Sequence, residues 1–386
     1  MNKTVEILRK HTMKIVLVLI VIFFSVMTKG QMFAASSFQA LIAQNAYVFV
    51  LAAGMLMCML TGGNIDLSVG SFVCFIGAIG GIMMVRNNMS VPAAILLMIG
   101  AGVIYGIVEG FLIAYINIPP WIATLAGYLA FRGWGTALIG GSSIAPLPEG
   151  FSKLFNGSVP DFFGGSGLNI TCIVVGVIVC VVFVLLQLKG RSDKLKKGYE
   201  TEKMGSVIVR CVLICAVILL FAYKLAQAGG IPNNLIWVAV ILLIYNFITS
   251  KTTIGRYFYT IGGNVEATRL SGIDTKKIFF LAYLNMAVLT VISAWMTMAR
   301  LSAGTSTAGT NYEMDAISAC VVGGVSAYGG SGTVFGMVVG AALIGVINLG
   351  MSLMGIDANW QRVVKGVVLL AAVVFEIMNN KEKTKE

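Results

Sequence analysis

Residues Thr61–Ser71 read TGGNIDLSVGS and interrupt a stretch of chain that otherwise looks suited to lipid. The run before them, LIAQNAYVFVLAAGMLMCML, and the run after them, FVCFIGAIGGIMMV, are typical of membrane helices. Gly62 and Gly63 allow the backbone to leave helical geometry, and Asp66 and Ser68 stand where a new helix would begin. A carboxylate there can accept free N–H groups of the first helical turn, which lowers the cost of a charge near lipid. We therefore predict that one helix ends and another begins here, and we favour a structural cap over substrate contact as the role of Asp66.

The composition indicates a polytopic, all-α membrane protein. Of 386 residues, 58% are hydrophobic and only 11% are charged, which is too little charge to cover a soluble surface. The net charge of +11 raises the possibility of nucleic-acid binding, but 18 of the 27 Lys and Arg residues lie in four short segments. These segments are residues 1–14, 189–203, 251–277 and the tail after 378. Cytoplasmic loops of membrane proteins collect basic residues in this way, so we predict an orientation signal and no nucleic-acid partner.

Cysteine and histidine usage argues against metal or redox chemistry. The seven cysteines lie in apolar runs without any CxxC pair, and the one histidine, His11, sits in the basic N-terminal arm. We interpret the cysteines as small buried hydrophobes. We predict no metal site, no cofactor and no catalytic residue.

Twelve stretches are apolar enough to be membrane-crossing helices. They are residues 15–28, 41–60, 67–85, 92–116, 121–139, 169–188, 207–228, 231–250, 278–299, 314–328, 333–355 and 360–378. The first also fits a signal peptide, but further spans follow at once, so we expect it to be retained. Twelve crossings put every basic segment on one side, whereas dropping either short stretch, 67–85 or 314–328, would not. We predict one transmembrane domain over residues 1–386 with both termini in the cytoplasm.

Three hydrophilic segments connect these spans at functionally interesting places. Residues 140–168 form the longest outer loop, rich in Gly, Ser, Pro and Phe, and are either a docking surface or a plain connector. Residues 189–206 form a basic cytoplasmic loop. Residues 251–277 form a second cytoplasmic loop, in which NVEATRLSGI predicts a short helix that contains Glu266 and Arg269 and stops at Gly272. That helix would either receive a cytoplasmic partner or lie passively at the interface.

Glycines mark further special places. The second half holds CVVGGVSAYGGSGTVFG, residues 320–336, and broken backbone at membrane depth is tolerated only against protein or a wet cavity. Two breaks in the two halves indicate a translocation pathway between them. Two series at every fourth residue, 102–110 and 332–340, predict grooves for close helix packing. No Gly-Lys of a phosphate-binding loop occurs, so the chain does not hydrolyse ATP by that route.

Four longer motifs resemble a known family. GGNIDLSVGSF, IPPWIATLAGYLAFRG, IGRYFYTIGGNVEATRLSGI and AISACVVGGVSAYGGSGTVFGMVVGAALIGVINLGM are similar to the permeases of bacterial ABC importers for ribose, xylose and related monosaccharides, over residues 40–378. The chain looks most like the xylose or multiple-monosaccharide permeases, which carry an added segment, here roughly 169–228. The resemblance implies a ten-helix core plus an inserted helix pair in the bacterial inner membrane. It also implies a permease homodimer, a separate ATPase that grips residues 252–278, and an extracytoplasmic sugar-binding protein.

The resemblance and the glycine breaks together suggest two sets of site residues. Pathway candidates are Asn45, Asn64, Asp66, Ser68, Glu109, Thr124, Ser326 and Asn348. Candidates for ATPase coupling are Gly255, Arg256, Gly263, Asn264, Glu266, Arg269, Ser271, Gly272 and Ile273, with Glu266 to Ile273 as the coupling helix. Glu109 departs from the family, where we expect a neutral polar residue. Arg132 and Arg86 are its candidate partners.

Other functions remain open. An ion-coupled secondary transporter needs ionisable groups inside the membrane, and here only Asp66, Glu109, Glu313 and Asp315 qualify. A membrane enzyme would need clustered catalytic groups, and none converge in the sequence. A permease for branched-chain amino acids or autoinducer would share the DLSVGS motif, but the string GRYFYTIGGNVEATRLSGI favours sugars.

Overall fold

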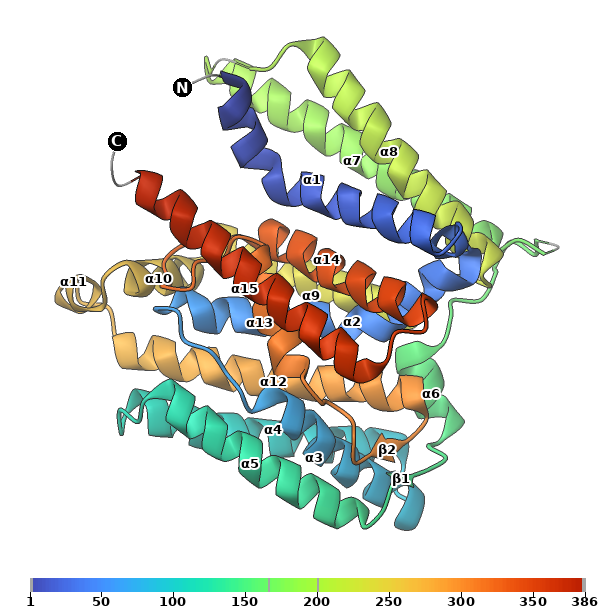
Figure 1. The fold of residues 1–386 in the computed structure, drawn as a ribbon, viewed down its shortest axis with the longest axis vertical. Coiled ribbons are helices and arrows are strands. Elements are labelled where there is room, and N and C mark those ends of the chain that lie inside the picture. The colour runs from blue at the N-terminus through green and yellow to red at the C-terminus, as the bar shows by residue number, and fades with distance from the viewer. Residues whose placement is uncertain (1–2, 166, 200, 384–386) are drawn as a thin grey trace.

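The structure, a computed structural model, describes residues 3–165, 167–199 and 201–383. The side chains of residues 3–12 and 375–383, including His11, lie outside the described part, as do residues 166 and 200 in two of the predicted loops. The described chain is a bundle of helices with a single two-stranded sheet at one end (Figure 1).

The longer helices are α1 (Lys3–Met27), α2 (Ala35–Leu60), α3 (Val69–Gly81), α4 (Val91–Ala114), α5 (Pro120–Ile139), α7 (Ile170–Lys196), α8 (Met204–Gln227), α9 (Asn233–Lys251), α12 (Thr275–Leu301), α13 (Tyr312–Val322), α14 (Val334–Leu353) and α15 (Ala358–Lys383). The shorter elements are η1 (Gln31–Phe33), the π-helical turn η2 (Ile82–Arg86), α6 (Glu149–Asn156), α10 (Thr253–Gly263), α11 (Val265–Leu270), β1 (Ser143–Ile144) and β2 (Gly304–Thr305). Among the described residues, eight helices are long and apolar enough to cross a membrane.

Helices α2 and α12 form the centre of the bundle. They contact each other, α12 also packs on α4, and α2 also packs on α13 and α14. Lipid is as apolar as the helix surfaces, so close approach of small residues holds such helices together. The predicted groove on α4 does this: Cβ atoms on Gly102, Gly106 and Gly110 would collide with Val291, Leu284 and Phe280 of α12.

The second predicted glycine groove is confirmed in part. Gly336 and Gly340 of α14 lie against the backbone carbonyls of Gly323 and Ala319, so α14 approaches α13 closely. Gly332 lies before the helix begins, with a φ of +150°, and faces Val325 instead.

The two short candidate spans differ: Val69–Arg86 is one helical stretch, long and apolar enough to cross a membrane, whereas the other is shorter than predicted. For residues 67–85, the helical part is α3 with η2, and irregular chain from Thr61 leads into it. The prediction of a helix over 314–328 is wrong in extent: α13 has 11 residues and ends at Val322. At 1.5 Å per residue it is about 16 Å long, against a hydrocarbon core of about 30 Å. The helix stops because the glycines that follow adopt a left-handed backbone, Gly324 and Gly329 among them.

The hydrophilic segments lie in two groups, at opposite ends of the bundle. The start of α1, the end of α15, the α7–α8 connection and α11 all lie toward the left of Figure 1. Helix α6 and the sheet lie toward the right, where Ser143 pairs with Thr305 and Ile144 with Gly304 in antiparallel register. The segment predicted to be inserted, roughly 169–228, forms the α7–α8 hairpin. Helix α7 continues beyond the predicted residue 188 to Lys196, so much of the predicted 189–206 loop is helical.

Candidate functional site

The first break is organised by Asp66. Gly62 and Gly63 have φ values of +116° and +74°, which end the helical path of α2. The Asp66 carboxylate then accepts hydrogen bonds from the backbone N–H and the hydroxyl of Ser68, at 2.8 and 2.6 Å. Asp66 is 1% exposed, so this turn is buried. Asp66 thus orders the turn before α3, but it does not accept the N–H groups of the first helical turn as predicted, because its partner Ser68 precedes the helix.

Glu109 belongs to the same polar cluster but has other partners than expected. The Tyr105 hydroxyl donates a hydrogen bond of 2.5 Å to Glu109 Oε1. Arg86 instead donates to the carbonyls of Leu138 and Ile139, and Arg132 donates to loop carbonyls at 306 and 308. Both arginine partners predicted for Glu109 are therefore wrong. Their guanidinium groups donate instead to backbone carbonyls at the end of α5 and in the loop after β2.

The Asp66–Glu109 cluster contains two open oxygens. Asp66 Oδ2 and Glu109 Oε2 receive no hydrogen bond from any described residue, and both side chains are at least 98% buried. Thr124 of α5 is fully buried as well. Buried polar atoms are normally satisfied, so these two oxygens are the places where a proton, water or polar solute would complete the structure.

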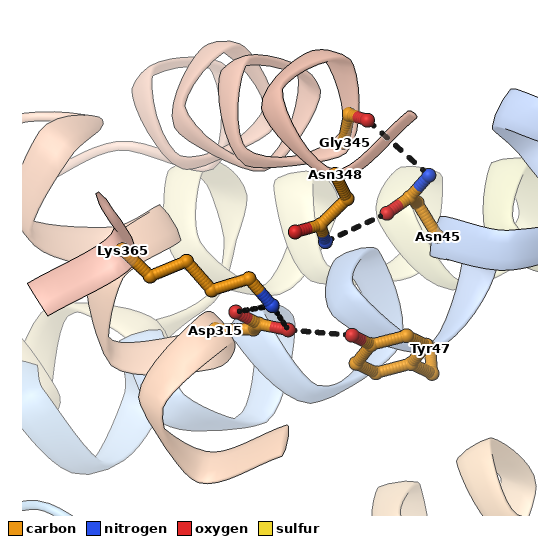
Figure 2. Close-up of polar contacts among 6 residues, drawn as sticks. All are labelled: Asn45, Tyr47, Asp315, Gly345, Asn348 and Lys365. Carbon is orange, nitrogen blue, oxygen red and sulfur yellow. Dashed lines mark hydrogen bonds and ion pairs between the residues drawn. The ribbon is translucent and has the colours of Figure 1, made fainter. Parts of the chain in front are cut away.

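A second cluster joins the two halves of the chain (Figure 2). Asn45 of α2 donates to the Gly345 carbonyl of α14 at 3.4 Å, and its own Oδ1 accepts from Asn348 Nδ2 at 3.0 Å. Two residues that the sequence analysis named separately as pathway candidates thus bind each other across 303 positions of chain.

Next to it lies a buried ion pair that the sequence analysis missed. Lys365 Nζ of α15 lies 2.9 Å from Asp315 Oδ1 of α13, and the Tyr47 hydroxyl donates to Asp315 Oδ2 at 2.5 Å (Figure 2). The Asp315 side chain is 2% exposed and that of Lys365 is 19% exposed. The signal was present, because a lysine inside an apolar stretch requires an acidic partner and Asp315 lies in another such stretch.

The two breaks meet α10 at one place, which we call the glycine junction: Gly62, Gly63, Gly262, Gly329 and Gly330. The Gly330 N–H donates to the Leu60 carbonyl at 3.1 Å. A Cβ on Gly63 would overlap the backbone of residue 327, one on Gly329 would overlap Gly62, and one on Gly262 would overlap both Leu60 and Gly330. The three backbones therefore touch directly, with no space for side chains between them.

The predicted short helix is confirmed as α11. Asn264 begins it, with its side-chain oxygen accepting from the Ala267 N–H at 2.9 Å. Glu266 and Arg269 form an ion pair of 2.6 Å along its exposed side, and Gly272, at φ +82°, ends it. Leu270 is 79% exposed, which leaves a large apolar side chain at the tip of the molecule.

The other coupling candidates surround α11. Ser271 Oγ donates back to the Ala267 carbonyl at 2.8 Å, and the Ile273 N–H donates to the Thr268 carbonyl at 3.4 Å. Gly255 is buried, because α10 packs its backbone directly on the end of α9 at this residue. Arg256 and Gly263 are exposed.

The pathway candidates do not converge on one opening. Asn64 bonds only locally, to the carbonyl and hydroxyl of Thr61 at 3.2 Å each, and Ser326 accepts from the Tyr328 N–H at 3.1 Å. All eight candidates are buried or half-buried. They fall into the Asp66–Glu109 cluster, the Asn45–Asn348 pair and the surroundings of the glycine junction.

A bundle of apolar helices with two glycine-rich breaks, both in contact with α10, is typical of a membrane transport protein. The chain belongs to the family described as branched-chain amino acid transport system / permease component, whose sequence model matches residues 37–373. This confirms the predicted membership among importer permeases and the inner-membrane location.

Three relatives cover almost the whole chain. The xylose transport system permease protein of Haemophilus influenzae is 35% identical over 97% of this chain and 98% of the relative. The xylose transport system permease protein of Escherichia coli K12 is 32% identical, over 92% and 88%. The ribose import permease protein of the same organism is 30% identical, over 87% and 84%. No solved structure matches the chain.

Proposed function

We propose that this chain is the permease subunit of an ATP-binding cassette importer that takes up a monosaccharide of the xylose type. The observation that carries the proposal is the similarity to a xylose permease over 97% of this chain. The family description names branched-chain amino acids, but the relatives reported above transport xylose or ribose by their names. The substrate is therefore a sugar rather than an amino acid.

Energy for transport comes from a separate ATPase that binds at α11. The exposed Glu266–Arg269 pair and the exposed Leu270 form a small surface of mixed character at the tip of the molecule. Such surfaces suit a reversible protein contact. Residues 251–277 thereby act as the cytoplasmic coupling loop, and the permease itself carries no catalytic site.

The glycine junction passes movement of α11 to the pathway. Helix α10, directly before α11, lies with Gly262 against both breaks, and the Tyr259 hydroxyl also donates to the Gly332 carbonyl at 3.0 Å. Because the backbones touch without intervening side chains, a displacement of α10 cannot occur without displacing both breaks. The pathway candidates are buried within the subunit, so the breaks must move for sugar to reach them.

The opposite end of the molecule receives the sugar-binding protein. Residues 140–168 contain α6 and a turn in which Asp161 accepts hydrogen bonds from the N–H groups of Phe163, Gly165 and Ile170. Phe162 and Phe163, on this turn, are 73% and 60% exposed. Two such permease subunits, related as a homodimer in the lipid bilayer, form the complete pathway.

Reconstitution in liposomes tests this proposal. With an ATPase subunit and a sugar-binding protein from the same importer class, uptake of labelled xylose requires ATP inside the vesicle and fails with leucine as substrate. The second candidate is an ion-coupled transporter, which the two open oxygens of the Asp66–Glu109 cluster favour. Uptake by this chain alone, driven by a proton or sodium gradient, would refute the importer proposal and support the second candidate.

A further inference from the structure

A basic cleft lies between α7 and α8, close to the connection that joins them. Its volume is ≈500 Å³, and its walls include Leu186, Arg191, Lys194, Glu202, Val207 and Arg210. The cleft belongs to the α7–α8 hairpin, which lies apart from α10 in Figure 1. None of the functions assigned above uses it.

Two of the three cationic side chains of the cleft bond to one residue, Glu202. Arg191 donates from Nε and Nη2 to the Glu202 carbonyl at 3.3 Å each, and the Arg210 guanidinium pairs with the Glu202 carboxylate. The Lys194 ammonium makes no hydrogen bond or ion pair within the described part of the chain. Among the described residues that line the cleft, three cations thus stand against the one carboxylate of Glu202, which leaves an excess of positive charge.

The cleft is apolar on its other side. Leu186 lies five positions before Arg191 on α7, which corresponds to about 7.5 Å along the helix axis. Leu186 is 63% exposed and continues the apolar surface of α7, and Val207 of α8, which also lines the cleft, is buried. An apolar wall that passes into a cationic rim over this distance matches the join between the acyl chains and the phosphate of a phospholipid. A free phosphate ion would have no use for the apolar wall.

A neighbouring hollow extends the polar side of the cleft. Its volume is ≈450 Å³, and it shares Lys194 with the first while adding Asp193, Lys197 and Tyr199. The hairpin has few helix partners besides itself: α7 packs on α8, and α8 packs on α2. A bound lipid would therefore add contacts where the protein supplies few.

We propose that this cleft binds the headgroup of an anionic phospholipid from the membrane leaflet that faces the basic segments. Basic pockets between membrane helices on the cytoplasmic side recognise such headgroups, and each Lys or Arg near the surface strengthens the binding. The excess positive charge selects an anionic lipid over a zwitterionic one. The site is independent of the transported substrate.

Native mass spectrometry of the full chain in detergent tests the site, with phosphatidylglycerol and phosphatidylcholine of the same acyl chains as probes. We expect wild type to retain phosphatidylglycerol preferentially. The double variant Arg191→Gln/Lys194→Gln should lose about 30-fold in apparent affinity, on the basis of two cations. The control Lys276→Gln/Lys277→Gln removes the same charge from the start of α12 and should bind as wild type does.

Further measurements distinguish binding of a phospholipid headgroup from general charge attraction and from binding of free phosphate. The variant Glu202→Gln removes the one carboxylate of the cleft and should tighten phosphatidylglycerol binding. Equal retention of the two lipids, or equal loss in the control variant, would overturn the proposal, because binding would then reflect general attraction. Displacement of phosphatidylglycerol by inorganic phosphate at equal concentration would also overturn it, because the apolar wall would then contribute nothing.

Discussion

Replacement of Lys365 by methionine isolates the buried ion pair that holds α13 to α15. Methionine keeps much of the length and the apolar stem of lysine, so the main loss is the ammonium group 2.9 Å from Asp315 Oδ1. Asp315, with 2% of its side chain exposed, would keep only the Tyr47 hydrogen bond. The variant therefore leaves the Asp315 carboxylate buried inside the bundle without a cationic partner.

The expected cost follows from burial. Removing one partner of a buried pair costs about 3–5 kcal/mol, because the remaining charge stays desolvated and unpaired. The Tyr47 hydrogen bond persists, and Lys365 is 19% exposed, so we expect the lower end, about 3 kcal/mol. In the double variant Asp315→Asn/Lys365→Met no charge is stranded, and the new side-chain amide oxygen can still accept from the Tyr47 hydroxyl. We therefore expect its stability to lie within about 1 kcal/mol of wild type.

Reversible unfolding of the purified protein in mixed micelles, with increasing denaturing detergent, measures these differences. The pair Glu149–Lys153 on α6 supplies the control, because its side chains are 78% and 70% exposed. Lys153→Met should cost less than about 1 kcal/mol. The reasoning fails if Lys365→Met is as stable as Lys153→Met, or if the double variant is as unstable as the single one.

Three further perturbations test the coupling path and the outer loop. Gly262→Ala should insert a methyl group into the glycine junction and cost about 1–3 kcal/mol with slowed uptake. The control Gly100→Ala in α4, with open space around it, should leave ATP-driven sugar uptake unchanged. Reversal of both charges on α11, Glu266→Arg with Arg269→Glu, should lower transport-coupled ATP hydrolysis in reconstituted vesicles; normal coupling with normal membrane insertion would remove α11 from the proposed role. Desolvation raises the pKa of Asp161, but hydrogen bonds from its own turn outweigh it and hold that pKa well below its usual range. Its contribution to the order of the outer loop is therefore present above the ordinary carboxyl pKa and is lost as pH falls. The protection of the turn's amides from exchange, relative to an unstructured peptide at the same pH, should therefore fall in acid for wild type, and in Asp161→Asn it should be weaker and lack that pH dependence.

Much of this architecture can be predicted from short stretches of the sequence. Long apolar runs, two glycine-rich interruptions and a basic loop determine the class of membrane protein without reference to any contact. The helix α11 was predictable because its start at Asn264 and its stop at Gly272 depend on residues within a few positions of each other. The groove on α4 was predictable for the same reason, since glycines at every fourth residue lie on one helix face.

Only the tertiary structure decided which of these features meet. The sequence assigned Glu109 to arginines, but the fold places Tyr105 beside it and turns both arginines toward loop carbonyls. The partnership of Asp315 with Lys365 spans 50 positions, and the glycine junction joins segments from three parts of the chain. A local pattern determines whether a segment is helical, broken or apolar, because those properties depend on neighbouring residues. Partners of buried charges depend on how whole helices pack, which no short stretch of sequence records.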